Sequence, residues 1–382
     1  MSTPRPRLFS GEPQHENFSR MDDFYPVREL SPSPRPYRFP DGKALELPEY
    51  YQFDGKQLTT RDFITATDTS ALLVLVNGKV CFEEYYLTGA ADVQWTSWSV
   101  AKSFVSALLG IAVEDGLIAS IDDPIDKYLP IIKGSAYEGV SIRDTLQMSS
   151  GADWNEDYND PQSDINRLGP VMMGQGSLQD FVCAIRPAVE SGTLCQYNSA
   201  DSQVLGLLLS EATGTTLSEY MQRKLCDPLG FESRGFWLMD KDGVEMALGG
   251  LNLTARDFAR IGELYRNNGK WEDQQIVPAA WVEASVRCDA PHLQQGNVIV
   301  GGHVFPSGYG YQWWVPAGDE GEFSAIGVYN QFVYVNPQKH SVIVKLSANR
   351  AYGTSAEERT NREEETVAFL RTINNSINPA MP

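Results

Sequence analysis

Residues 95–116 read WTSWSVAKSFVSALLGIAVEDG, and the interpretation of the whole chain starts from this stretch. The apolar residues between Phe104 and Ala112 recur at three- and four-residue intervals, which predicts an amphipathic helix that stops at the terminal glycine. Ser99 and Lys102 stand three residues apart at the head of this helix and therefore share a face. A buried face explains the apolar residues, but it does not explain a lysine one turn away from a serine.

A serine and a lysine at this spacing suit nucleophilic catalysis. A serine hydroxyl is a weak nucleophile until a base takes its proton. Lysine is such a base when it is neutral, and lowering its pKa from about 10.4 to about 7 requires roughly 4–5 kcal/mol of preference for the neutral form. Burial beside an apolar helix face favours the neutral form, and a nearby tyrosine would help by sharing the proton. The alternative is a chance spacing with Lys102 at the surface, although no other lysine follows a serine at this distance.

The composition limits the classes of partner. The chain has 382 residues and a formal net charge of −19, which argues against nucleic acid and anionic membranes because both require clustered Lys and Arg. No apolar run is long enough to span a bilayer, and the N-terminal segment lacks the apolar core of a signal peptide. The five cysteines are scattered and odd in number. We therefore expect reduced thiols and a cytoplasmic location.

Composition and periodicity divide the chain into segments. Residues 1–60 are rich in proline and charge and predict an extended arm packed on the body. Residues 61–95 hold two β-rich runs around an Asn-Gly pair, a strong type I′ hairpin signal. Residues 96–269 read as a mostly helical domain, and strands return within residues 270–382, joined by short links that imply antiparallel pairing. The predicted fold class is α+β, with an antiparallel sheet from both chain ends flanked by helices, an inserted all-α region, and the active site at the domain interface.

Other catalytic patterns are missing from the sequence. It contains no G-x-S-x-G, no H-E-x-x-H and no P-loop. None of the four histidines forms a recognisable pattern with a serine, which argues against a Ser-His-Asp enzyme. The acidic run within residues 153–160 lacks the ligand order of a calcium loop, so we expect a solvated loop there. We expect no metal and no cofactor.

Several segments, taken in order, resemble one family. They are WSVAKSF around Ser99, GLIASIDDPIDKYLP, SIRDTLQMSSGADWNEDY, CQYNSAD and GGLNLTARDFARIG, followed by the last strands, and they span roughly residues 70–350. The chain resembles the serine β-lactamase-like superfamily, in the branch of class C β-lactamases and family VIII carboxylesterases. Within that branch it is most similar to the 6-aminohexanoate-dimer (nylon oligomer) hydrolases. The resemblance implies the β-lactamase/transpeptidase-like fold.

The resemblance also implies catalytic roles. Ser99 would be the nucleophile that carries the acyl group, and Lys102 would accept its proton. Tyr197, in the second motif, would pass the proton to the leaving group and then help to activate water. The backbone N–H groups of Ser99 and Val328 would form the oxyanion hole, an element often worth a few kcal/mol.

The substrate-binding residues that the resemblance implies are Trp154, Tyr158, Ser199, Gly327, Tyr329 and Gln331, with Phe332 adding to an aromatic lining. For Gly327 we expect a close backbone approach rather than a chemical role. Two departures from the family pattern bear on specificity. Ala325 replaces the lysine of the K-T-G motif, which disfavours efficient β-lactam hydrolysis. Tyr329-Asn330-Gln331 stands where the oligomer hydrolases read H-G-Q, which changes the pocket wall.

The expected function is a serine hydrolase that cleaves small linear amides or carboxylic esters through an acyl-enzyme, similar to the 6-aminohexanoate-oligomer hydrolases. Alternatives on the same fold are a family VIII carboxylesterase, a D-amino-peptide hydrolase and a weak β-lactamase. A non-catalytic ligand-binding relative is a further alternative, which the intact Ser99, Lys102 and Tyr197 disfavour. The expected partner is a small-molecule amide or ester, with no nucleic acid and no membrane, and the sequence leaves a homodimer open.

Overall fold

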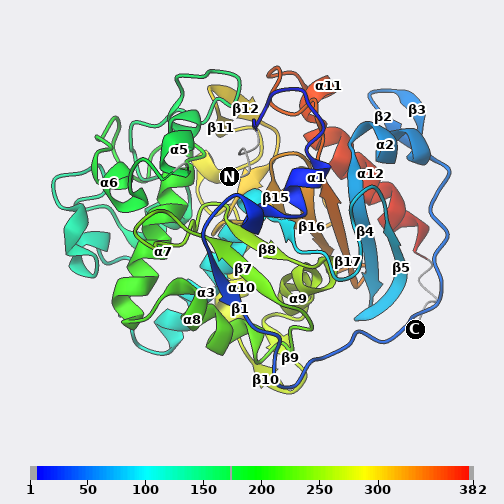
Figure 1. Ribbon diagram of the computed structural model, residues 1–382, viewed down its shortest axis with the longest axis horizontal. Helices are drawn as coiled ribbons and strands as arrows, with labels where there is room; N and C mark the ends of the chain where they lie inside the picture. The colour runs from blue at the N-terminus through cyan, green and yellow to red at the C-terminus, as the bar shows by residue number, and fades with distance from the viewer. Residues whose placement is uncertain (1–6, 173, 378–382) are drawn as a thin grey trace.

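The computed structural model describes residues 7–172 and 174–377. Its central element is a seven-stranded sheet of order β13-β14-β15-β16-β17-β4-β5, in which all neighbours are antiparallel. Its strands are β4 Thr69–Val76, β5 Lys79–Tyr85, β13 Gly308–Tyr309, β14 Trp314–Val315, β15 Phe323–Gly327, β16 Gln331–Asn336 and β17 Ser341–Ser347. Both ends of the chain contribute to one sheet, which confirms the predicted fold class (Figure 1).

Helices and smaller strands surround this sheet. The α-helices are α1 His15–Phe18, α2 Thr60–Ala66, α3 Ala101–Glu114, α4 Ile142–Leu146, α5 Asp164–Met172, α6 Leu178–Cys183, α7 Ser199–Thr213, α8 Leu217–Met221, α9 Ala255–Arg266, α10 Ala279–Ser285, α11 Glu358–Asn361 and α12 Glu363–Ser376. The other strands are β1 Val27–Leu30, β2 Tyr50–Phe53, β3 Lys56–Thr59, β6 Trp95–Thr96, β7 Gly235–Leu238, β8 Leu251–Leu253, β9 Lys270–Trp271, β10 Gln274–Gln275, β11 Val298–Val300 and β12 His303–Phe305. Short 3-10 helices are η1 Met21–Asp23, η2 Trp98–Val100, η3 Ile125–Lys127, η4 Pro130–Ile132 and η6 Pro291–Leu293, and η5 Gln222–Cys226 is a π-helical turn. Among the described residues, no helix has both the length and the hydropathy needed to cross a membrane.

The β4–β5 hairpin turns at Asn77 and Gly78, whose φ angles are 51° and 69°. Two successive positive φ angles belong to a type I′ turn, so the hairpin predicted from the Asn-Gly pair is confirmed. β4 is buried along its whole length, and alternate side chains enter different cores. Leu73 faces one core, whereas Leu72 and Val74 face the other, so the sheet is the middle layer of the body.

Helices cover both faces of the sheet. On one face, α2 and α12 meet through Phe63 and Phe369, whose ring centroids are 4.5 Å apart. On the other face, α9 approaches β17 so closely that a Cβ at Gly262 would lie 2.6 Å from Val342 Cγ1. A larger residue at this position would push the helix away from the sheet.

The helix predicted after Ser99 is α3, but it is buried on all sides rather than on one face. Every residue from Ala101 to Ala112 is buried. The face opposite the apolar stripe carries small residues, and a Cβ at Gly110 would lie 2.6 Å from the Trp281 ring of α10. Small residues on this face allow close approach of neighbouring helices, so α3 lies in the middle of the helical region beside the sheet (Figure 1).

A second sheet interrupts the region predicted to be mostly helical. It has four strands in the order β1-β7-β8-β6. The sequence did not reveal it because β7 and β8 are short and fully buried, and therefore show no alternation of polar and apolar residues. β6 pairs with β8 and leads directly into the segment that holds Ser99. The predicted boundaries of the arm and the two domains stay a prediction, although α9, assigned to residues 96–269, packs on the large sheet.

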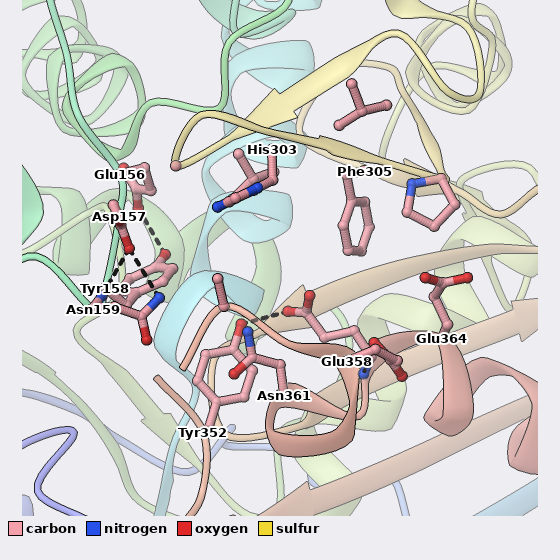
Figure 2. Close-up of a pocket in the computed structure, with 16 residues that line it drawn as sticks. Glu156, Asp157, Tyr158, Asn159, His303, Phe305, Tyr352, Glu358, Asn361 and Glu364 are labelled. Carbon is pink, nitrogen blue, oxygen red and sulfur yellow. Dashed lines mark hydrogen bonds between the residues drawn. The ribbon is translucent and has the colours of Figure 1, made fainter. Parts of the chain in front are cut away.

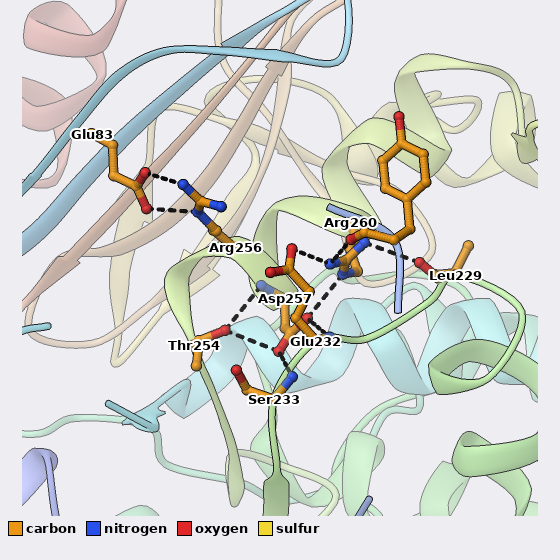
Figure 3. A network of polar contacts seen from close by, with 9 residues as sticks. Glu83, Leu229, Glu232, Ser233, Thr254, Arg256, Asp257 and Arg260 are labelled. Atoms are coloured by element: carbon orange, nitrogen blue, oxygen red, sulfur yellow. Dashed lines mark hydrogen bonds and ion pairs between the residues drawn. The ribbon is translucent and has the colours of Figure 1, made fainter. Parts of the chain in front are cut away.

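Buried charges fix the start of α9 (Figure 3). Asp257 and Arg260 are fully buried and form an ion pair with 2.9 Å between Oδ1 and Nε. Asp257 also accepts hydrogen bonds from the N–H groups of Glu232 and Ser233, and Arg260 donates to the carbonyl oxygen of Leu229. The interior tolerates these charges because they are paired and hydrogen-bonded, and removing one partner of such a pair costs about 3–5 kcal/mol. The ARDFARIG part of the family-like motif thus has a structural role.

The N-terminal arm belongs to the core beneath Ser99. Phe18 is fully buried, and its ring lies 6.0, 5.4 and 4.9 Å from the rings of Trp95, Trp98 and Tyr329. β1 of the same arm forms the edge of the four-stranded sheet. The arm therefore supports the segment that leads to the proposed nucleophile.

Candidate active site

Ser99 lies in η2, directly after Trp98, and Lys102 lies in the first turn of α3. Trp98 has a φ of 44°, a conformation that a bulky residue keeps only where its surroundings hold it. The rings of Phe18 and Tyr329 hold it at centroid distances of 5.4 and 5.6 Å. With this geometry, Ser99 Oγ lies 2.8 Å from Lys102 Nζ.

The Lys102 amine has three hydrogen-bond partners, which are Ser99, Ser199 and the backbone of Leu248. The carbonyl oxygen of Leu248, 2.6 Å away, can only accept. Ser199 Oγ, 3.2 Å away, donates its own proton to Glu156 Oε1 at 2.6 Å and therefore accepts from the amine. A neutral amine has two N–H bonds and one lone pair. The two N–H bonds are used by these acceptors, so the lone pair is left for the hydroxyl proton of Ser99.

The burial of Lys102 prepares it to act as a base. The side chain is 1% exposed. Burial lowers the pKa of Lys102 from its ordinary value to about 8, and the negative charge of Glu156 opposes this decrease. A general base is most effective when its pKa lies near the working pH. A slightly alkaline solution therefore leaves a useful fraction of the amine neutral.

Tyr197 lies beside the Ser99–Lys102 pair. Its ring centroid lies 5.2 Å from Lys102 Nζ, and the ring stacks on Trp314 at 5.1 Å. Burial, followed by the negative charge of Glu156, raises the pKa of Tyr197 well above its ordinary value, and a hydrogen bond with Ser99 opposes this only in part. The phenol therefore stays protonated at neutral pH and is placed to donate a proton beside Ser99.

Gly327, at the end of β15, lies against the Ser99 backbone. A Cβ at this position would lie 2.5 Å from Ser97 O and 3.0 Å from Ser99 N, so the close approach requires glycine, as expected from the sequence. Val328 follows, and it lines the same cavities as Ser99. The oxyanion hole formed by the N–H groups of Ser99 and Val328 stays a prediction.

Glu156 is a site residue that the sequence reasoning missed. It was assigned to a solvated acidic loop, but it is 1% exposed. Its carboxylate accepts hydrogen bonds from the Ser199 N–H at 2.9 Å, Ser199 Oγ at 2.6 Å and the Tyr158 hydroxyl at 2.8 Å, and also from the Trp154 indole. The sequence does contain a pattern that could have indicated this role: W-x-E-x-Y places one aromatic hydrogen-bond donor on each side of the carboxylate. Glu156 thus connects the loop before α5 to Lys102 through Ser199.

Three expected substrate contacts need correction. Trp154 is 3% exposed and donates to Glu156, so it supports the site from behind. The Tyr329 hydroxyl accepts the Phe9 N–H at 2.9 Å, and its ring packs under the arm. Gln331 is fully buried, and its amide bonds to Trp95 and to the backbone. None of the three lines the cavities beside Ser99. The β15–β16 turn points Tyr329 and Gln331 into the core, whereas Trp154 is held by its hydrogen bond to Glu156. Phe332, expected in an aromatic lining, is also fully buried, in the core that contains Leu72 and Val74.

An apolar cavity of about 320 Å³ opens beside Ser99. Its walls come from three regions of the chain: Leu8, Phe9 and Tyr25 of the arm, Ile165, Leu168 and Met172 of α5, and Met246 and Leu248. Tyr158 and Ser199 line it as well, as predicted for substrate contact, although their role stays a prediction. Arg7, at the edge of the described chain, is the one charged residue among its lining.

A second, polar cavity of about 180 Å³ lies beyond Tyr158 and Tyr352 (Figure 2). Figure 2 shows His303 and Phe305 of β12 on one side and Tyr352, Glu358 and Asn361 on the other. A third, small cavity of about 20 Å³ shares lining residues with both the apolar and the polar cavity. It is lined by Ser99, Tyr197, Gly327 and Val328 and, toward the polar cavity, by Tyr158, Tyr352 and Glu363.

Replacing Glu156 with glutamine is expected to shift the acid limb of the kcat/KM profile to lower pH. The negative charge of Glu156 raises the pKa of Lys102, so the neutral amide lets the lysine lose its proton at lower pH. We also expect a roughly tenfold lower kcat because Ser199 is held less well. Stopped-flow or steady-state rates from pH 6 to 10 measure both.

Asp153→Asn is the control for this change, since it removes a charge from an exposed position of the same loop. Its acid limb should stay where the wild type has it. An unmoved or upward-shifted limb in Glu156→Gln would show that Glu156 does not act on Lys102.

Comparison with known proteins agrees with this geometry. Residues 59–368 match the family model described as Beta-lactamase. The chain is 32% identical over 291 residues to a 6-aminohexanoate-dimer hydrolase of Paenarthrobacter ureafaciens, an alignment that covers 74% of this chain and 73% of the relative.

Solved structures share the fold. One, from Bacillus anthracis and provisionally assigned as a 6-aminohexanoate-dimer hydrolase, superposes with a TM-score of 0.83 at 22% identity over 98% of both chains. EstCE1, a hydrolase with promiscuous acyltransferase activity, superposes with a TM-score of 0.63 at 17% identity, covering 83% of this chain and 96% of its own. The family match spans most of the chain and includes the Ser99–Lys102 pair, the Tyr197 motif and the closing strands. The chain therefore belongs to the Beta-lactamase family.

Proposed function

We propose that this β-lactamase-fold hydrolase cleaves small linear amides or carboxylic esters through an acyl-enzyme on Ser99. The observation that carries the proposal is the buried Lys102 amine, 2.8 Å from Ser99 Oγ, with its other two partners both acting as acceptors. The identity to a 6-aminohexanoate-dimer hydrolase supports a linear amide or a related ester as substrate. The five unpaired cysteines are consistent with a cytoplasmic location.

The proposed acylation uses Ser99, Lys102 and Tyr197. The Ser99 hydroxyl proton moves to the Lys102 amine as Oγ forms a bond to the substrate carbonyl carbon. The oxyanion develops between the N–H groups of Ser99 and Val328. Tyr197 donates its proton to the leaving nitrogen or oxygen as the amide or ester bond breaks, and Lys102 returns a proton to the phenol.

Deacylation uses the same groups in reverse order. Water takes the place of the leaving group and its oxygen bonds to the acyl carbon. Its proton passes to the neutral Lys102 amine, either directly or through Tyr197 as the phenol gives its own proton to Lys102. The bond between the acyl carbon and Ser99 Oγ then breaks, and the serine regains its proton. The free acid and the resting enzyme result, and no external reactant besides water is needed.

The site supports a linear substrate better than a β-lactam. The cavity beside Ser99 is mainly aliphatic and aromatic, which suits an alkyl acyl group. Ala325, at the position of the K-T-G lysine, is 1% exposed within β15 and offers no cation to a β-lactam carboxylate.

Labelling with a fluorophosphonate, followed by intact-mass and peptide mass spectrometry, tests the proposal. We expect one adduct, located on Ser99, together with hydrolysis of p-nitrophenyl butyrate and much slower turnover of nitrocefin. The linear 6-aminohexanoate dimer, assayed beside them, reports on amide cleavage. Absence of an adduct on Ser99 would instead favour a ligand-binding protein that keeps the fold.

A further inference from the structure

The polar cavity beyond Tyr352 is strongly acidic. Its lining includes five carboxylate side chains, those of Glu156, Asp157, Glu358, Glu363 and Glu364. No lysine or arginine lines it, and His303 is its one basic side chain. None of the ion pairs formed within residues 7–172 and 174–377 includes any of these five acids, although the charge of Glu156 acts on Lys102. Glu358, Glu363 and Glu364 therefore have no paired cation from the described chain.

Two of these carboxylates are held in place by the protein. Glu358 accepts the N–H groups of Glu363 at 3.2 Å and Glu365 at 2.9 Å, which fixes its carboxylate at the start of α12. Glu363 accepts from the hydroxyl of Tyr352 through Oε1, and its other oxygen accepts no hydrogen bond from the described chain. Burial raises the pKa of each of these two carboxyl groups to about 7. A cation placed beside these two groups would favour their charged forms, so the site suits a positively charged ligand.

An unused acceptor lies in the same cavity. The Oδ1 atom of Asn159 is buried and has no hydrogen-bond partner in the described chain. Its amide nitrogen donates to Asp157 Oδ1 at 3.0 Å, which fixes the amide with the oxygen free. Buried acceptors normally find a donor. A ligand that donates N–H bonds and carries positive charge, such as a primary ammonium, satisfies both this oxygen and the carboxylates.

The position of Tyr197 shows which part of a substrate reaches this cavity. Tyr197 donates to the leaving atom in the proposed mechanism, so the leaving group lies on its side of Ser99. Tyr197 lines the small third cavity together with Glu363 and Tyr352, and it does not line the apolar cavity. The acyl group therefore occupies the apolar cavity, and the leaving group extends past Glu363 into the acidic one.

We propose that the acidic cavity is a leaving-group subsite that selects substrates whose amine or alcohol portion carries an ammonium group, such as acylated diamines and amino alcohols. This inference rests on the proposed hydrolysis at Ser99 and adds the charge of the substrate. It predicts an uncharged aliphatic acyl group joined to a cationic leaving group. A carboxylate on the leaving group would be repelled.

A charge-matched substrate series tests this subsite. The probes are hexanoyl esters of 5-aminopentanol, 1-hexanol and 6-hydroxyhexanoate, which differ in leaving-group charge but little in length. At pH 8 and low ionic strength, we expect kcat/KM to fall in the order cationic, neutral, anionic. A charged hydrogen-bonded contact of this kind favours the cationic over the neutral ester by about 10- to 100-fold. The preference should weaken as salt is added.

Variants of the acidic cavity test whether its carboxylates cause the preference for the cationic ester. In the double variant Glu358→Gln/Glu363→Gln, the ratio of kcat/KM for the cationic ester to that for the neutral ester should fall about tenfold. Because both rates come from one preparation, a loss of folded protein cancels in the ratio. Glu357→Gln is the control, since Glu357 is exposed, pairs with Arg359 and does not line the cavity. Its ratio should match the wild type.

The outcomes separate the two proposals. Turnover of the neutral ester with no preference for the cationic one, or with a preference for the anionic one, overturns the subsite and leaves hydrolysis at Ser99 intact. A preference that persists in the double variant also overturns it. Failure to cleave any ester, with no fluorophosphonate adduct on Ser99, overturns the hydrolase proposal and this inference together.

Discussion

Replacing Ser99 with alanine is expected to lower kcat by about five orders of magnitude, the effect of removing the nucleophile in a hydrolase of this type. The Lys102 lone pair would then have no hydroxyl proton to accept, and no acyl-enzyme could form. Binding of substrate in the apolar cavity should change much less, because the side chain loses a single oxygen. Steady-state rates with p-nitrophenyl butyrate, together with the absence of a fluorophosphonate adduct, measure the result.

A matched control lies in α3, the helix that follows Ser99. Ser106 of α3 is fully buried, and its hydroxyl has no hydrogen-bond partner in the described part of the chain. Ser106→Ala should retain most of the wild-type activity. If Ser99→Ala kept even a few per cent of the wild-type kcat, another group would be the nucleophile.

Replacing Lys102 with methionine is expected to lower kcat/KM by about 10³- to 10⁴-fold, near the upper end for loss of a general base. Methionine has a similar length and fills the buried space, but it has no lone pair on nitrogen for the Ser99 proton. Lys102→Arg should be just as inactive, because a guanidinium does not lose its proton in a protein. A variant that keeps the positive charge but not the activity would show that basicity, rather than charge, is required.

The pH profile of the wild type follows from the same residue. Lys102 acts when neutral, so kcat/KM should rise with pH and level off above the Lys102 pKa, which burial lowers to about 8. Lys345 is the control, because it is also a fully buried lysine but donates to Thr67 and Ser347 away from the cavities. Lys345→Met should keep the wild-type acid limb per folded molecule. A wild-type rate that is independent of pH between 6 and 9 would contradict the role of Lys102.

Local signals in the sequence were sufficient for several features. The Asn77-Gly78 pair predicted the β4–β5 hairpin because only a few residue types adopt two positive φ angles in succession. The spacing of Ser99 and Lys102 predicted their contact because residues three apart on a helix share a face. The place of Tyr197 came from the resemblance to a family and not from any local pattern.

Other features could not be predicted from local signals. The four-stranded sheet has strands too short and too buried to show a period. The sequence predicted a solvated loop around Glu156 because acidic runs are usually solvated. In the structure, the side chain of Glu156 is buried against Ser199. Tyr329 and Gln331 were expected in the pocket wall, but their direction depends on a turn whose two positive φ angles, at Tyr329 and Asn330, carry no glycine signal.

The sequence by itself indicated the fold class, through strands at both ends of the chain, and the contact between Ser99 and Lys102, through their spacing. The catalytic roles of the two residues stay a prediction. Only the tertiary structure decided which side chains form the walls of the two cavities and which charges remain without a partner. The physical reason is that burial and pairing depend on what distant segments bring to one place. The walls of the cavities near Ser99 come from segments that are far apart in the chain: the arm, the loop before α5, the β11–β12 hairpin and the α11–α12 corner. No local sequence pattern predicts that these segments come together.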